Sequence, residues 1–152
     1  MSYIKLKFQL ICKDTIYGEN ICIVGNSNSL GNWDTNKSIE LKTDSHIFPL
    51  WESNPIAFNN KLNLEYKYII MNKNYNNIKW ESFLGNRQLN LSNLIKDNEY
   101  LINDGEFNFN KNLRITEINQ KSSKINEKKN KNKNNNLKKE ININKNNKSN
   151  SK

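Results

Sequence analysis

Two stretches of the chain alternate apolar and polar residues with a period of two. In residues 3–12 the apolar face consists of Ile4, Leu6, Phe8, Leu10 and Cys12. In residues 62–71 it consists of Leu62, Leu64, Tyr66 and Tyr68, and Lys67 falls on the opposite, polar face. This period is typical of half-buried β-strands. The sequence therefore predicts two long strands, each with one face in a hydrophobic core.

Shorter apolar segments separated by turn residues indicate further strands. The expected segments are 19–24, 39–42, 50–58, 78–83, 87–91 and 106–110. Pro55 lies inside one of them and has no backbone N–H for a ladder hydrogen bond, so residues 50–58 should form an edge strand or a broken one. About seven or eight short strands, with no convincing helix before residue 112, predict an all-β sandwich or barrel.

The charge of the chain is concentrated near its C-terminal end. Of 152 residues, 24 are Lys or Arg and 15 are Asp or Glu, which gives a net charge of +9. Residues 1–112 hold 12 basic and 12 acidic residues, whereas residues 113–152 hold 12 basic and 3 acidic ones, and 23 of these last 40 are Asn or Lys. Such a composition cannot bury enough apolar surface to fold. We expect a charge-balanced β domain over 1–112, which argues against a nucleic-acid footprint there, and a disordered basic tail over 113–152.

The sequence also gives expectations about location. No stretch approaches the roughly 20 apolar residues of a membrane span. The N-terminal residues are broken by Lys5 and Lys7 and do not read as a secretory signal. Cys12 and Cys22 fall in different predicted strands, which favours buried reduced thiols. We expect a monomeric, cytoplasmic protein.

Four residues outside the core pattern point to sugar binding. Trp33 closes a turn-rich loop, and Trp80 lies on the strand that returns from a hairpin. If the hairpin pairs as expected, Lys67 and Trp80 lie on neighbouring strands, and Asn86 follows in a glycine turn. Flat rings pack against the apolar face of a pyranose, and nearby amines and amides bond its hydroxyls.

Aromatic residues and the histidine can also have purely structural roles, which compete with the sugar-binding interpretation. A tryptophan in a small β-domain is usually a core residue, and Trp51 is the one that we assign to the core. Tyr17, which precedes Gly18, is either a turn aromatic or a ligand contact. His46 is expected to be a surface loop residue, since no catalytic or metal-ligand spacing accompanies it. We therefore expect no enzyme activity, no catalytic residue, no cofactor and no metal site.

Five motifs follow one another along residues 3–110. They are YGENICIVGNSNSLGNWD at 17–34, LW at 50–51, EYKY at 65–68, WE at 80–81 and NR at 86–87. In this order and spacing they resemble carbohydrate-binding module family 20, the starch-binding domain. The resemblance implies an immunoglobulin-like β-sandwich, generally non-catalytic, that binds α-1,4-glucans such as starch, amylopectin or glycogen.

The resemblance also implies roles for individual residues. The implied first site uses Trp33 and Trp80 as stacking platforms and Lys67, Glu81 and Asn86 as partners of sugar hydroxyls. A second site would begin with Tyr17. Its other aromatic would lie in the segment KTDSHIFPLW, where His46 or Phe48 could stand in.

Two classes of function follow. The leading hypothesis is a non-catalytic module that binds an α-glucan polysaccharide, either alone or as a fragment of a larger glucan-acting enzyme. The alternative is an interaction protein whose basic tail attracts RNA, an anionic membrane or an acidic partner.

Overall fold

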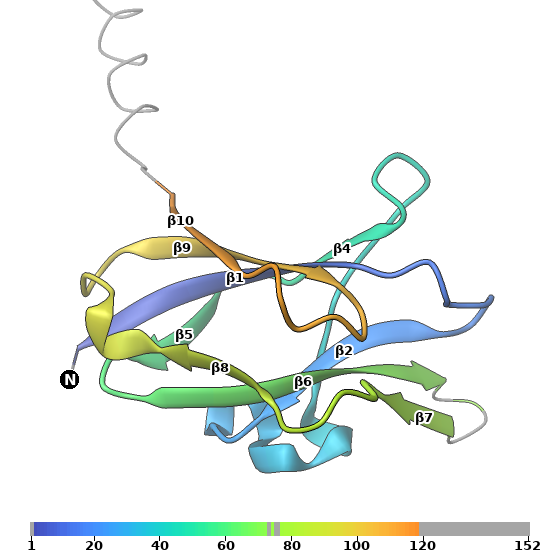
Figure 1. The fold of residues 1–152 in the computed structure, drawn as a ribbon, viewed down its shortest axis with the longest axis horizontal. Coiled ribbons are helices and arrows are strands. Elements are labelled where there is room, and N and C mark those ends of the chain that lie inside the picture. The colour runs from blue at the N-terminus through green and yellow to red at the C-terminus, as the bar shows by residue number, and fades with distance from the viewer. Residues whose placement is uncertain (1, 73, 75–76, 119–152) are drawn as a thin grey trace, which may run out of the picture. The chain divides into compact units, whose positions relative to one another are not determined.

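Two β-sheets stack face to face and enclose the hydrophobic core (Figure 1). The structure is a computed structural model, and it describes residues 2–72, 74 and 77–118. In this part of the chain there are ten strands, rather than the seven or eight that we expected, in two sheets of five. The prediction of an all-β sandwich is confirmed.

Each sheet is assembled from strands that are distant in sequence. Sheet 1 consists of β10 (Arg114–Glu117), β9 (Glu99–Glu106), β1 (Tyr3–Ile11) and β4 (Leu50–Glu52) in that order, with β5 (Ile56–Asn59) also paired to β1. Sheet 2 consists of β3 (Ile39–Glu40), β2 (Asn20–Gly25), β6 (Asn63–Asn72) and β7 (Asn77–Trp80), with β8 (Arg87–Asn90) also paired to β6. The pairing of β1 with β9 is parallel, and the others in these sheets are antiparallel.

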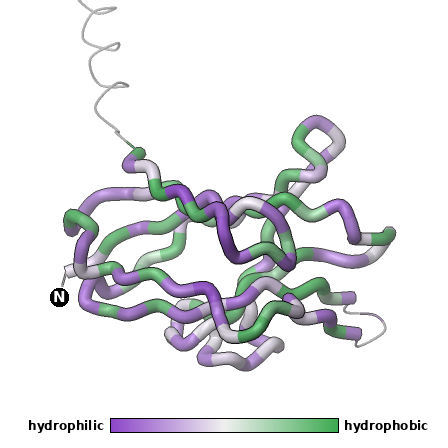
Figure 2. The backbone as a smooth tube through the Cα atoms, viewed as in Figure 1, coloured by the Kyte–Doolittle hydropathy of each residue, from purple (hydrophilic) through white to green (hydrophobic). Residues whose placement is uncertain are grey.

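β1 and β6 lie inside their sheets with strands paired on both sides, and their alternation determines which side chains face the core. Figure 2 shows hydrophobic and hydrophilic positions alternating along the strands. The inward residues of β1 and β6 are buried; they are Ile4, Leu6, Phe8, Leu10, Leu64, Tyr66, Tyr68 and Ile70. Trp51 on β4 is only 4% exposed, and its indole N–H donates to the carbonyl of Cys12 over 3.2 Å. The prediction that Trp51 is a core residue is confirmed.

A second, smaller hydrophobic cluster lies on the outer face of sheet 2. It contains Cys22 and Val24 of β2 and Ile69 of β6, all buried although they point away from the main core. Two 3₁₀ turns, η1 (Asn28–Trp33) and η2 (Thr35–Lys37), lie on this outer side, where Figure 1 shows them as light-blue coils. A third, η3 (Leu91–Asn93), follows β8.

One expected strand is wrong, and another is broken as expected. Residues 106–110 do not form the last strand: they begin at the end of β9 and continue into a turn in which Asn108 has a φ of 69°. The segment 50–58 is broken around Pro55 into β4 and β5, as one of the two expectations stated.

The sequence pattern did not predict β9, because the inward face of this strand is not wholly apolar. Its buried residues are Tyr100, Ile102 and Asp104, so an acidic residue interrupts the apolar alternation. Asp104 is buried because its partners lie on other strands, which a local pattern does not show.

The boundary at residue 112 was too early. β10 lies inside the predicted tail and pairs with β9, although each of its four residues is exposed. Backbone hydrogen bonds to a sheet edge hold this strand, and side-chain composition does not report them. The rest of the predicted tail, from residue 119 on, lies outside the described residues.

The two cysteines belong to different clusters. Cys12 is part of the core between the sheets and Cys22 part of the outer cluster, and no disulfide joins them. Burial raises the pKa of the Cys12 thiol. None of the helices among residues 2–72, 74 and 77–118 is long and apolar enough to cross a membrane.

Replacing Trp51 with alanine should remove a core side chain and leave a cavity. We expect Trp51→Ala to lower the free energy of unfolding by about 3–5 kcal/mol in urea denaturation. Trp80→Ala is the matched control, because Trp80 is 42% exposed and should cost no more than about 1 kcal/mol. Equal stability of the two variants would contradict this assignment of the rings.

Candidate functional site

Two tryptophan side chains lie next to each other on the outer face of sheet 2. The ring centroids of Trp33 and Trp80 are 6.5 Å apart and their planes are inclined by 37°. Trp80 is 42% exposed, and Trp33 is half-buried with one side packed against the outer hydrophobic cluster. The sequence predicted both residues as ligand contacts, and the structure brings them together.

The loop before Trp33 is shaped by its caps and by Gly31. Ser27 caps η1 by accepting the N–H of Leu30, and Asp34 caps η2 by accepting the N–H of Asn36. Gly31 has a φ of 77°, and a Cβ there would be 2.7 Å from the carbonyl oxygen of Lys37. A side chain at this position would therefore push the two turns apart. The tight packing of η1 on η2 therefore determines the position of Trp33 on the outer side of sheet 2.

Strand register places Trp80. It lies opposite Ile69 of β6, and Lys67 is two residues from Ile69 on the same strand face. Successive side chains of a strand point to opposite faces, so Lys67, Ile69 and Trp80 share the outer face. The prediction that Lys67 and Trp80 lie on neighbouring strands is confirmed.

Lys67 is held against the turn that follows β7. Its Nζ donates to the carbonyls of Glu81 (3.2 Å) and Phe83 (3.0 Å), and it lies 4.8 Å from the centroid of the Phe83 ring. These two bonds use two of the three ammonium hydrogens. The ammonium is therefore held in place on the outer face that also carries Trp80.

Asn86 belongs to the same turn and is oriented from sheet 2. Its Nδ2 donates to Glu65 Oε2 over 2.9 Å, and Glu65 lies on the outer face of β6 two residues from Lys67. Gly85, with a φ of 78°, allows the chain to turn immediately before Asn86. The remaining N–H and the oxygen of the amide are the groups that it offers to a ligand.

The carboxylate of Glu81 faces the interior, whereas the family resemblance implied that it bonds sugar hydroxyls. It is buried and accepts bonds from Arg87 Nε (3.0 Å), Arg87 Nη2 (2.6 Å), the backbone N–H of Tyr68 (3.0 Å) and that of Asn108 (3.1 Å). The reason is strand parity: Trp80 points outward, so the next residue points inward. The backbone carbonyl of Glu81, in contrast, accepts a hydrogen bond from Lys67 of the candidate site.

Arg87 and Asp104 complete a buried polar network that the sequence did not reveal. Arg87 is 2% exposed and also donates to the carbonyls of Asp104, Glu106 and Phe109. Asp104 accepts the hydroxyls of Tyr66 (3.0 Å) and Tyr68 (2.6 Å). Tyr66, Tyr68 and Arg87 stood in the motifs EYKY and NR, whereas Asp104 stood in none of the five motifs.

Burial sets the protonation behaviour of this network. Removal from water raises the pKa of Asp104 to about 6, although the tyrosine hydroxyls and Arg87 pull the value down. Burial, together with the negative charge of Asp104, raises the pKa of Tyr66 and Tyr68 well above the usual value. These hydroxyls therefore keep their protons and act as donors.

Tyr17 lies apart from these residues. It is fully exposed in the loop between β1 and β2, just before Gly18 with its φ of 88°. Phe48 is about half exposed and His46 is exposed in the segment before β4. No ring contact joins Tyr17 to either of them among the described residues. The structure does not assemble a second aromatic pair here.

Comparison with protein families gives a clear match. The family model described as "Starch binding domain" matches residues 3–101, about two thirds of the chain. The chain belongs to the starch-binding domain family. The match covers every residue of the first site, from Trp33 to Asn86, and the family resemblance read from the motifs is confirmed.

Related proteins share the domain within much longer chains. Glucoamylase-1 of Schizophyllum commune is 40% identical over 68 residues, which are 45% of this chain and 11% of that protein. Cyclomaltodextrin glucanotransferase of Bacillus sp. (strain 1-1) is 37% identical over 81 residues, 52% of this chain and 11% of that one. This chain thus spans about a tenth of the length of these curated relatives.

Solved structures agree with the fold. The family 20 CBM of a maltotetraose-forming amylase from Pseudomonas saccharophila has a TM-score of 0.52 at 28% identity, covering 68% of this chain and 99% of that one. A gamma-CGTase from alkalophilic Bacillus clarkii has a TM-score of 0.58 at 25% identity, covering 70% of this chain and 15% of that one.

Breaking the buried ion pair should cost much stability. Glu81→Ala leaves the guanidinium of Arg87 buried without its carboxylate, and we expect a loss of about 3–5 kcal/mol in urea denaturation. Glu65→Ala is the control, since Glu65 is only half-buried and should cost no more than about 1 kcal/mol. If Glu81→Ala were as stable as the control, the network would not hold the fold.

Asp104 should make stability depend on pH. Its folded pKa of about 6 lies above the ordinary 3.8, so the folded state binds the proton more tightly. The free energy of unfolding should therefore fall as the pH rises from about 4 to about 6 and level off above, by about 3 kcal/mol at 1.36 kcal/mol per pKa unit.

Asp104→Asn should abolish that part of the pH dependence. The difference in unfolding free energy between wild type and variant is measured at pH 4 and pH 7. A direct carbon NMR titration of the wild-type Asp104 carboxyl group gives the pKa even if the variant does not fold. A titration midpoint near 4 would contradict the assignment.

Proposed function

We propose that the outer face of sheet 2 binds a chain of α-1,4-linked glucose units. The supporting observation is the pair of indoles, Trp33 and Trp80, with centroids 6.5 Å apart on one face. One exposed ring and one half-buried ring this close suit two consecutive pyranoses better than a compact ligand, because each ring covers one apolar sugar face. Membership in the starch-binding domain family favours an α-glucan among sugar polymers.

Polar groups beside the rings supply directional contacts. The third hydrogen of the Lys67 ammonium and the free positions of the Asn86 amide lie at the turn after β7 and would bond the sugar hydroxyls. Both groups are already held by the protein, so little side-chain entropy is lost when they bind. In this proposal Glu81 acts through its buried carboxylate, as a positioning residue.

The expected affinity for one short glucan is weak. Covering roughly 100 Å² of apolar surface per ring contributes about 2.5 kcal/mol. Two rings give about 5 kcal/mol, and an association cost of about 4 kcal/mol or more offsets most of it, so one short glucan should bind weakly. A polysaccharide offers many overlapping sites, and this raises the apparent affinity.

Tyr17 is a separate candidate contact. Its full exposure beside a glycine turn supports a second, weaker point of attachment for the same polymer. We propose that it contributes one ring alone, because the aromatic residues of the segment before β4 do not pair with it.

For the protein as a whole we propose a non-catalytic anchoring role. The domain would hold a glucan while any chemistry belongs to other parts of a longer protein or to a partner, as the size of the relatives suggests. Buried Cys12 and Cys22 without a disulfide support our proposal of a reducing, cytoplasmic location.

Removing either indole should weaken glucan binding without unfolding the domain. We expect Trp33→Ala and Trp80→Ala each to reduce retention of the full chain on granular amylopectin by about tenfold or more, as measured by co-sedimentation. Tyr3→Ala is the matched control, because Tyr3 is an exposed aromatic on sheet 1. Wild-type retention in both folded tryptophan variants would refute the proposed site.

A further inference from the structure

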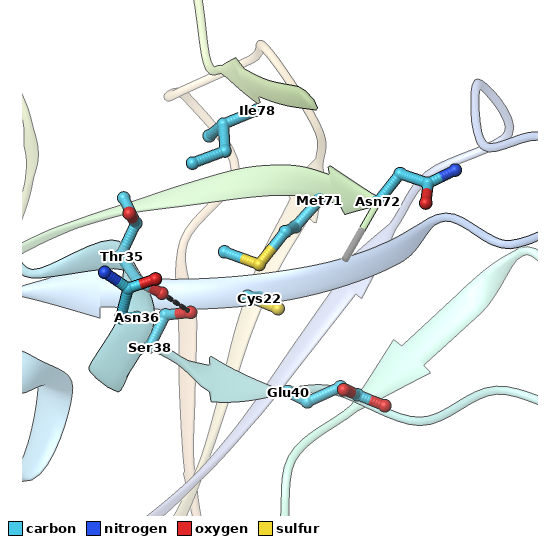
Figure 3. Close-up of a pocket in the computed structure, with 8 residues that line it drawn as sticks. All are labelled: Cys22, Thr35, Asn36, Ser38, Glu40, Met71, Asn72 and Ile78. Atoms are coloured by element: carbon cyan, nitrogen blue, oxygen red, sulfur yellow. Dashed lines mark hydrogen bonds between the residues drawn. The ribbon is translucent and has the colours of Figure 1, made fainter. Parts of the chain in front are cut away.

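A groove lies on the outer face of sheet 2 and has no part in the site described so far. Its volume is about 310 Å³, at the lower end of the range for small-molecule sites. The lining residues, drawn in Figure 3, are Cys22, Thr35, Asn36, Ser38, Glu40, Met71, Asn72 and Ile78. None of them is among the residues that the sequence predicted to bind a ligand.

The same two chain segments build the groove and the indole pair. One wall is η2, which starts two residues after Trp33; the other contains Ile78 on β7, two residues before Trp80 and on the same strand face. Met71 on the floor is the register partner of Ile78. Trp33, Met71 and Ile78 all pack against the outer hydrophobic cluster. The groove is therefore a continuation of the surface that carries the indoles.

The groove combines an apolar floor with a neutral polar wall. Met71 and Cys22 form the floor, Ile78 belongs to the apolar wall, and Figure 3 shows Thr35, Asn36 and Ser38 on the opposite side. This combination repeats the chemistry of the indole site, where apolar rings adjoin an amide and an amine.

The polar wall is held in place by the protein itself. The Ser38 hydroxyl donates to the carbonyl of Thr35 over 2.8 Å, the dashed line in Figure 3, and the Asn36 backbone N–H donates to Asp34 Oδ1 over 3.0 Å. Asn36 is exposed. A ligand would therefore meet a wall that is already ordered, which lowers the entropy cost of binding.

Charge narrows the class of ligand. Among the described residues that line the groove, Glu40 is the charged one, and in Figure 3 its side chain extends away from Met71. The other described lining residues are neutral, so they offer no cationic side chain to a phosphate or another anion. A neutral, polyhydroxylated ligand with an apolar face fits the lining best.

We propose that the groove binds a further glucose unit of the glucan chain that is stacked on Trp33 and Trp80. This inference rests on the proposed function and extends it. The domain would then recognise three or more consecutive units, and chain length would be part of its specificity. Ile78 and Met71 would cover the apolar face of the added unit, while Thr35 and Asn36 bond its hydroxyls.

The test compares the dissociation constants of maltose and maltotetraose, measured by NMR titration of the full chain. Four linked units contain three overlapping pairs, so a site for two units alone gains only about threefold from statistics. With the groove engaged, we expect wild type to bind maltotetraose about thirtyfold more tightly than maltose, a further factor of ten that corresponds to about 1.4 kcal/mol.

Two groove variants and two controls separate the possibilities. Ile78→Asp places a carboxylate under the added sugar, where desolvation is unfavourable, and Asn36→Ala removes a polar partner from the exposed wall. Ile115→Asp makes the same change at an exposed isoleucine on sheet 1. Trp80→Ala removes the indole site itself.

The gain is the factor by which maltotetraose binds more tightly than maltose. The proposal predicts that Ile78→Asp returns this gain to about threefold, and that Asn36→Ala lowers it at least twofold. Both should leave the maltose constant within about twofold of wild type, while Ile115→Asp changes neither constant. A wild-type gain of only about threefold, or an unchanged gain in both groove variants, would overturn the groove inference. The proposed function would survive in that case if maltose binding still required Trp80. Failure of both sugars to bind wild type would overturn both.

Discussion

Glu81 and Arg87 form a buried ion pair that connects the end of β7 with the start of β8. Arg87 reaches on to carbonyls of β9 and the turn after it, and Asp104 joins Tyr66 and Tyr68 of β6 to the same network. The pair thus links sheet 2 to sheet 1 through the core. Its charges are tolerated because each is met by several hydrogen bonds.

The outer surface depends on this inner arrangement. Trp80 and Asn86 are the residues immediately before Glu81 and Arg87, and alternation along a strand sends neighbours to opposite faces. Fixing the two inward side chains therefore fixes the two outward ones. Lys67 adds a bond from the outer face to the Glu81 carbonyl. The position of the candidate binding residues on the outer face therefore depends on the buried polar network on the inner face.

Much of this could be predicted from the sequence, because period-two alternation shows directly which side of β1 and β6 is buried. It also placed Lys67 beside Trp80 through the hairpin. The buried role of Glu81, the strand β9 and the edge strand β10 could not be read in this way. Asp104 and Arg87 are buried by partners on distant strands, and β10 is held by backbone bonds that leave its side chains exposed.

Titration of the protein with maltoheptaose, followed through the three indole N–H signals in NMR spectra, tests the central claim most directly. Trp33 and Trp80 should shift together and give the same dissociation constant, because both rings contact one glucan chain. Trp51, buried between the sheets, should not move. A shift of Trp51 alone, or different constants for Trp33 and Trp80, would contradict the account.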